Sequence, residues 1–138
     1  MDAKRGLTGT IVGAVVIYGV GYLIFNVLAA NYYAAHAGSA TGVNRTPQLI
    51  WAVALGSVTY AALITWAMMR RPGSTSIGQG AMIGAIVGFL AWGTADVTLY
   101  GITNINSLTI ALLDPCLEAI HAGLAGAAIA AVAGKANG

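Results

Sequence analysis

The amino-acid sequence predicts an all-α integral membrane protein, a bundle of four transmembrane helices. Of its 138 residues, 58% are hydrophobic and only 7% are charged, whereas about 25% of the residues in a typical soluble domain are charged. Four apolar runs, separated by short polar or glycine-rich stretches, are each long enough to cross a hydrocarbon core of about 30 Å. We therefore expect a single membrane domain, residues 1–138, with spans at about 7–30, 49–69, 77–100 and 108–133.

The first expected span, residues 7–30, has one polar and aromatic side. It begins like a signal peptide, with basic residues before an apolar run, but the run is too long for a typical signal sequence. We expect Asn26 to share a helical face with Tyr22 and Tyr33. Residues 31–48 form an expected loop, whose tyrosines fit the aromatic belt at a membrane interface.

The third expected span, residues 77–100, begins with three glycines at four-residue spacing, Gly80, Gly84 and Gly88. This pattern of small residues lets another helix approach closely. Asp96 lies near the far end of the span, and we expect it on a different side of the helix from the glycines. The span is therefore predicted to have one side for packing and another for polar contacts.

The fourth expected span, residues 108–133, carries the strongest functional signal in the chain. Asp114, Glu118 and His121 are spaced so that they share one face of a helix. Ionisable side chains inside a membrane are costly, face the interior of a bundle and mark functional sites. We expect Asn106 or Ser107 to cap the start of this helix.

The distribution of basic residues predicts the topology. In a four-span arrangement, Arg45 alone falls on one side, and five basic residues fall on the other: Lys4, Arg5, Arg70, Arg71 and Lys135. The positive-inside rule then places both termini in the cytoplasm. The same arrangement brings the polar residues of the spans to overlapping depths, which predicts a pocket that opens outward: Asn26, Asp96, Asp114 and Glu118, with His121 below them.

A metal site is an alternative interpretation of these residues. Glu118 and His121 have the Glu-x-x-His spacing found on the helices of carboxylate-bridged di-iron proteins. Those sites need two such motifs and two further Glu residues, and this chain has one motif. If a metal is bound, we expect Glu118, His121 and Asp114 to be its ligands. No sequence pattern indicates another cofactor.

Part of the sequence resembles a known family. The stretch from Gly84 to Thr98, followed by residues 108–114, is similar to a family of bacterial four-helix membrane proteins of unknown function. The resemblance implies the four-helix fold, a bacterial inner membrane location, and importance for Asp96 and Asp114. It also implies an acid in the first helix, where this chain has Asn26.

Three classes of function remain open. The first is a binding or transport module, oligomeric and multi-pass, that holds a proton, a cation or a small polar ligand at its acid and histidine cluster. The second is a structural or accessory subunit that packs against a homo-oligomeric copy or a partner membrane subunit. The third is a metal-binding membrane enzyme, although the residues favour a protein without enzyme activity. The net charge of +2 is too small to indicate nucleic-acid binding, so the expected partners are the lipid bilayer and other membrane chains.

Overall fold

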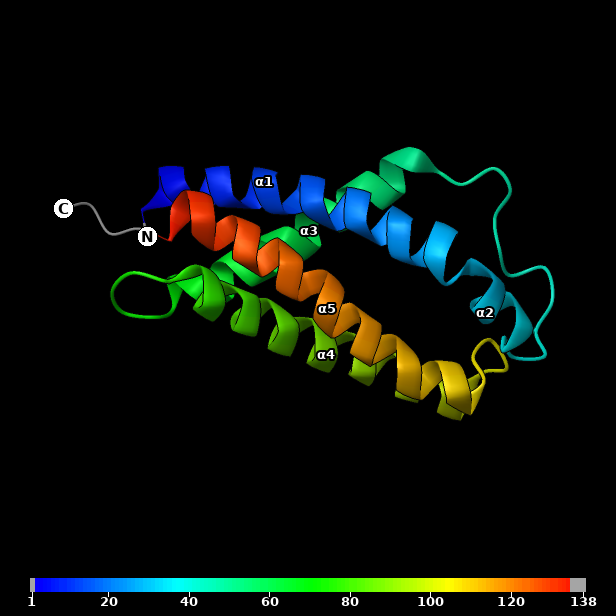
Figure 1. Cartoon of the computed structure of the whole chain (residues 1–138). Coiled ribbons are helices and arrows are strands. Elements are labelled where there is room, and N and C mark those ends of the chain that lie inside the picture. The colour runs from blue at the N-terminus through cyan, green and yellow to red at the C-terminus, as the bar shows by residue number, and fades with distance from the viewer. Residues whose placement is uncertain (1, 135–138) are drawn as a thin grey trace.

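The computed structural model describes residues 2–134, and in this range it is all-helical, without a β-strand. Its helices are α1 (Ala3–Gly21), the π-helix η1 (Tyr22–Leu28), α2 (Ala30–Ala35), α3 (Ile50–Met69), α4 (Ile77–Ile102) and α5 (Leu108–Ala133) (Figure 1). Four segments are long and apolar enough to cross a membrane, namely α1 with η1, α3, α4 and α5. The predicted number of such helices is confirmed, and their ends differ from the expected ends by only a few residues.

Polar side chains fix the beginnings of three helices. Asp2 and Ser107 each accept a hydrogen bond from the backbone N–H three residues further on, which caps α1 and α5. Ser76 and Gln79 form a reciprocal capping box at the start of α4. Ser107 is therefore the N-cap of α5, one of the two residues expected there.

The segment expected to be a loop, residues 31–48, begins as a helix. The chain leaves α1 through the π-helix η1, and a break at Ala29 starts the short helix α2. Tyr33 on α2 then donates a hydrogen bond to Asp114. The expected aromatic belt at the membrane interface stays a prediction, and the structure adds a hydrogen-bond partner for the Tyr33 hydroxyl.

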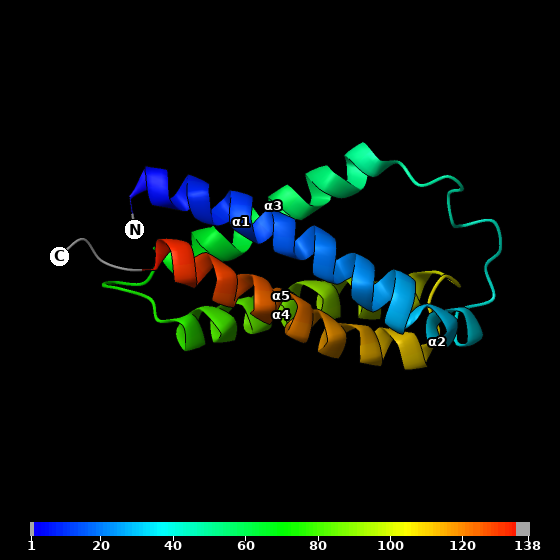
Figure 2. The ribbon, with the colours of Figure 1, turned by 45° about the horizontal axis from the view of Figure 1, so that its top comes forward.

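Helices α4 and α5 lie side by side along their length (Figures 1 and 2). The glycine strip of α4 makes this possible, since a Cβ atom at Gly88 would lie 2.5 Å from the carbonyl oxygen of Glu118, and Gly80 and Gly84 face the α5 backbone equally closely. Asp96 is buried on the same face as these glycines. Its expected placement away from the packing side is wrong: the row of every fourth residue drifts by about 40° a step, and α5 follows this row along α4, so that Asp96 meets Asp114 of α5.

Helix α3 crosses the other helices at an angle, and its first turns lie away from α5 (Figures 1 and 2). The second half of α3 packs closely against α1 and α5. There the helices share a core of small and branched side chains: Ala14, Ile17, Ala61, Ile64, Met68, Ala122, Ala125, Ile129, Ala130 and Ala133. The bundle is thus tightly packed at one end and more open at the other.

Backbone hydrogen bonds tie the loops at each end. At the α2 end, the N–H groups of Gly38 and Ala40 donate to the carbonyl oxygens of Ile105 and Asn104, at 3.0 and 2.9 Å. At the opposite end, the N–H of Thr75 donates to the carbonyl oxygen at the end of α5, at 2.7 Å. These contacts join the α2 region to the α4–α5 connection, and the α3–α4 turn to the end of α5.

Candidate binding site

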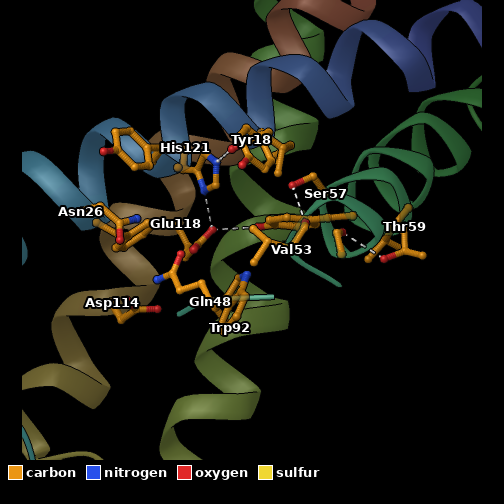
Figure 3. Close-up of a pocket in the computed structure, with 17 residues that line it drawn as sticks. Tyr18, Asn26, Gln48, Val53, Ser57, Thr59, Trp92, Asp114, Glu118 and His121 are labelled. Atoms are coloured by element: carbon orange, nitrogen blue, oxygen red, sulfur yellow. Dashed lines mark hydrogen bonds and ion pairs between the residues drawn. The ribbon is translucent and has the colours of Figure 1, made fainter. Parts of the chain in front are cut away.

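A cavity of about 700 Å³ lies between α1, η1, α3 and α5, where α3 diverges from the bundle (Figure 3). It extends from His121 to Gln48, which precedes α3. The packed core lies beyond His121. Most of the wall is apolar or aromatic, and several polar side chains interrupt it: Asn26, Gln48, Ser57, Thr59, Asp114, Glu118 and His121. This volume is within the range of sites for small organic molecules, about 300–1,000 Å³.

Glu118 is the centre of a hydrogen-bond cluster on the cavity wall. Its side chain is buried, with only 4% of the residue exposed. The Oε2 atom accepts a hydrogen bond from the Tyr60 hydroxyl at 3.2 Å and lies 3.0 Å from Nδ1 of His121. The Oε1 atom accepts no hydrogen bond from any residue between 2 and 134. One carboxyl oxygen is thus held by protein groups, and the other is left for an occupant of the cavity.

The contacts of His121 fix how protons are arranged around it. Its Nε2 lies 2.8 Å from the carbonyl oxygen of Ile17, and since a carbonyl can only accept, Nε2 carries a proton. The contact between Nδ1 and Glu118 then holds one further proton. With that proton on His121 the two groups form an ion pair, and with it on Glu118 they form a neutral hydrogen bond. In either form the pair has no net charge.

Asp114 connects the cavity to a second carboxyl group. Its Oδ1 accepts a hydrogen bond from Tyr33, and its carboxyl group interacts with that of Asp96 on α4. Asp96 in turn accepts a hydrogen bond from the Asn106 amide at 3.1 Å, while its buried Oδ2 has no partner among the described residues. Two carboxylates in contact repel strongly in a dry site, so this pair is most stable with one shared proton and one negative charge.

Two glycines make room for this cluster. A Cβ atom at Gly88 would lie 2.8 Å from the Tyr60 hydroxyl oxygen, and one at Gly21 would lie 3.0 Å from the imidazole ring of His121. Any larger residue at either position would displace the side chains that contact Glu118. These glycines therefore shape the site as well as the helix packing.

The structure brings most of the sequence-predicted residues together. Asn26, Asp114, Glu118 and His121 all line the one cavity. Asp96 does not line it, because it lies in the α4–α5 contact behind Asp114. The glycine strip of α4 is used within the chain against α5.

The sequence did not point to several residues of the cavity wall, among them Tyr60, Trp92 and Gln48. Tyr60 and Trp92 are aromatic residues within apolar spans, and nothing in their spacing separates them from lipid-facing aromatics. Gln48 precedes the second span and looks like an ordinary loop residue. To predict that these residues lie near the acids, one must know the angle at which α3 crosses the bundle, and the sequence does not reveal that angle.

The donor set does not form a metal site. Within residues 2–134, no group of three or more His, Cys, Asp and Glu side chains is placed to hold one metal ion. The two nitrogens of His121 already face Glu118 and the Ile17 carbonyl. This leaves His121 without a free nitrogen to act as a ligand beside Glu118 and Asp114.

Comparison with known proteins gives no match to a family model, to a curated protein or to a solved structure.

Proposed function

We propose that this chain is a small multi-pass membrane protein that binds a ligand in its cavity and couples that binding to protons. The observation that carries the proposal is the position of Glu118 and Asp114 on a cavity wall. Most buried polar atoms in proteins have a hydrogen-bond partner, so an unpartnered carboxyl oxygen on a cavity wall favours a ligand there. Here Glu118 is 4% exposed, lines the cavity and keeps one oxygen without a partner in the described chain.

The proposed location is the bacterial inner membrane, with both termini in the cytoplasm. Four apolar helices support a multi-pass arrangement. Four of the basic residues, Lys4, Arg5, Arg70 and Arg71, belong to the end of the bundle at which α1 begins and α3 ends. Arg45 lies in the loop at the opposite end, and Lys135 lies outside the described residues. The positive-inside rule then makes the α2 end the outer one, so the cavity faces outward.

An oligomer remains part of the proposal, although the glycine strip no longer supports it. Gly80, Gly84 and Gly88 pack against α5 of the same chain and are not free to contact a second copy. One chain supplies the acids, the histidine and the aromatic walls of the cavity. Binding therefore does not require a partner subunit to complete the site.

The experiment is the thermal stability of the purified protein against pH, for wild type and Glu118→Gln. We expect wild-type stability to be greatest at intermediate pH. Acid leaves a charged His121 beside a neutral Glu118, and base leaves a buried carboxylate beside a neutral imidazole. An unpaired buried charge costs about 3–5 kcal/mol, so the loss of stability should be measurable both in acid and in base.

Glu118→Gln should abolish the loss of stability in base while the fold is kept, because an amide cannot ionise but still accepts from Tyr60. The loss in acid should remain, because it comes from charging the buried His121. Asn26→Ala is the control, since Asn26 lines the same cavity without touching the Glu118–His121 pair, and it should keep the wild-type profile. A wild-type profile that does not vary with pH, and is the same in Glu118→Gln, would refute a titrating site and favour a structural subunit.

A further inference from the structure

The chemistry of the cavity wall restricts what it can bind. Within residues 2–134, no Lys or Arg lines the cavity, and apolar and aromatic side chains dominate its walls, among them Tyr18, Tyr22, Phe25, Tyr60 and Trp92. Such a wall gives an anionic headgroup no counter-charge. It also suits a bare metal ion or a sugar poorly, because most of the surface offers no hydrogen bond.

Four of the hydroxyl donors in and beside the cavity wall are occupied. Tyr33 and Tyr60 donate to Asp114 and Glu118. The hydroxyl groups of Ser57 and Thr59 donate to carbonyl oxygens of their own helix, at 3.0 and 2.9 Å. Among residues 2–134, the hydrogen-bonding groups of the wall that keep free capacity include the Oε1 atom of Glu118, which accepts, and the amides of Asn26 and Gln48, which donate or accept.

Counting protons gives the cavity one negative charge. The Glu118–His121 pair is neutral in both of its forms, since Nε2 of His121 must stay protonated toward Ile17. The Asp96–Asp114 pair is most stable with one shared proton and one charge. Figure 3 shows Asp114 and Glu118 near one another on the same side of the cavity, so Asp114 is the member of the charged pair that faces the space a ligand would fill.

We propose that the cavity binds a monovalent organic cation with an apolar body, such as a hydrophobic ammonium or phosphonium ion. The cationic centre lies against Asp114 and the free oxygen of Glu118, and the apolar body lies against the aromatic walls. Aromatic faces add attraction for a cation of this kind. This inference rests on the proposed function and names the ligand class of the same site.

Binding of the cation competes with binding of a proton to the acid pair. The groups that face this pair are Tyr33 from α2, Asn106 from the α4–α5 connection, and Glu118 and His121 from α5; Tyr60 from α3 faces Glu118. None of these groups carries a fixed positive charge. Helices α1 and η1 contribute two titratable residues to the cavity wall, Tyr18 and Tyr22. In acid, where both carboxyl groups are protonated, one proton leaves for each cation that binds. Affinity should therefore rise as pH rises.

The test uses tetraphenylphosphonium as the probe, with purified full-length protein in detergent and titration calorimetry from pH 5 to pH 9. Triphenylphosphine oxide is the neutral analogue and tetraphenylborate the anionic one. We expect the cation to bind at least tenfold more tightly than either, and its affinity to increase with pH. Asp114→Asn should weaken cation binding at least tenfold, because the amide carries no charge and the remaining acid of the pair, Asp96, lies behind this position and does not line the cavity.

Asp2→Asn is the matched control, since this acid caps α1 outside the cavity, and it should bind the cation like wild type. Thermal stability of Asp114→Asn, together with its binding of the neutral analogue, establishes that the variant is folded. Equal binding of all three probes, unchanged in Asp114→Asn, would overturn the inference and make the cavity a general apolar site. Absence of cation binding would also overturn it, and the pH profile of Glu118→Gln then decides separately whether the proposed function stands.

Discussion

Tyr33 illustrates how one residue outside the apolar spans controls a carboxyl group inside the bundle. Its burial, together with its hydrogen bond to Asp114, raises the pKa of the Tyr33 hydroxyl far above the ordinary tyrosine value of about 10. Tyr33 therefore remains a protonated donor throughout the neutral and moderately alkaline range. The folded state holds this proton more tightly than the unfolded state, so the contribution to stability is complete below about pH 10 and is lost as the pH rises further.

Replacing Tyr33 by Phe should lower the free energy of unfolding by about 1.5–3 kcal/mol near neutral pH, the range for a hydrogen bond to a charged group. The loss should shrink in acid, because a hydroxyl bonds a carboxylic acid more weakly than a carboxylate. Tyr32→Phe is the control, since the Tyr32 ring stacks on His36 and its hydroxyl donates to no group within residues 2–134. Chemical denaturation at pH 5 and pH 8 measures the difference. Equal stability of Tyr33→Phe and Tyr32→Phe at both values would contradict this role.

At the scale of elements, the contact between α4 and α5 depends on the absence of side chains. A Cβ atom at Gly84 would overlap the carbonyl oxygen of Ala122 and lie 3.2 Å from the Cα atom of Gly126. Both neighbours belong to the backbone of α5, so they cannot rotate away as a flexible side chain could. This close approach also aligns Asp96 on α4 with Asp114 on α5.

Gly84→Ala should therefore destabilise the protein by about 1–3 kcal/mol, the usual cost of overpacking, and should separate Asp96 from Asp114. Gly19→Ala is the matched control, because Gly19 lies within α1 and a Cβ there meets no atom within 4 Å. That change should be neutral or stabilising by about 0.5–1 kcal/mol, since Ala favours helix over Gly. The measurement is thermal unfolding of both variants in one detergent. A Gly84→Ala protein as stable as Gly19→Ala would show that the two helices are not in close contact.

The four apolar runs locate α1 with η1, α3, α4 and α5 because hydrophobic length is a property of each segment alone. The spacing of Asp114, Glu118 and His121 likewise places them on one face of α5. The sequence does not reveal which residues of different segments contact one another. The crossing angle of α3 decides that Tyr60 meets Glu118, and the break at Ala29 decides that Tyr33 meets Asp114.

At the scale of the whole molecule, the two ends of the bundle differ in charge and in openness. The end at which α1 begins holds Lys4, Arg5, Arg70 and Arg71, next to the packed core. The opposite end holds α2, the long loop with Arg45, and the cavity. If the packed end faces the cytoplasm, a ligand reaches Asp114 and Glu118 from outside or from the outer leaflet, and the core separates them from the cytoplasm.

This arrangement predicts which loops are accessible from each side of the membrane. Cysteines are introduced singly at Ser74 and at Ser39, in a Cys116→Ala background that removes the exposed native thiol. Ser74 lies in the turn between α3 and α4, and Ser39 lies in the loop after α2. A membrane-impermeant maleimide applied to intact cells should label Ser39→Cys and not Ser74→Cys, and inverted vesicles should reverse the result, because the two loops belong to opposite ends. Labelling of both positions from the same side would contradict the four-span topology. Labelling in the opposite sense would keep four spans but turn the cavity toward the cytoplasm, and the direction of ligand entry would then have to be reversed.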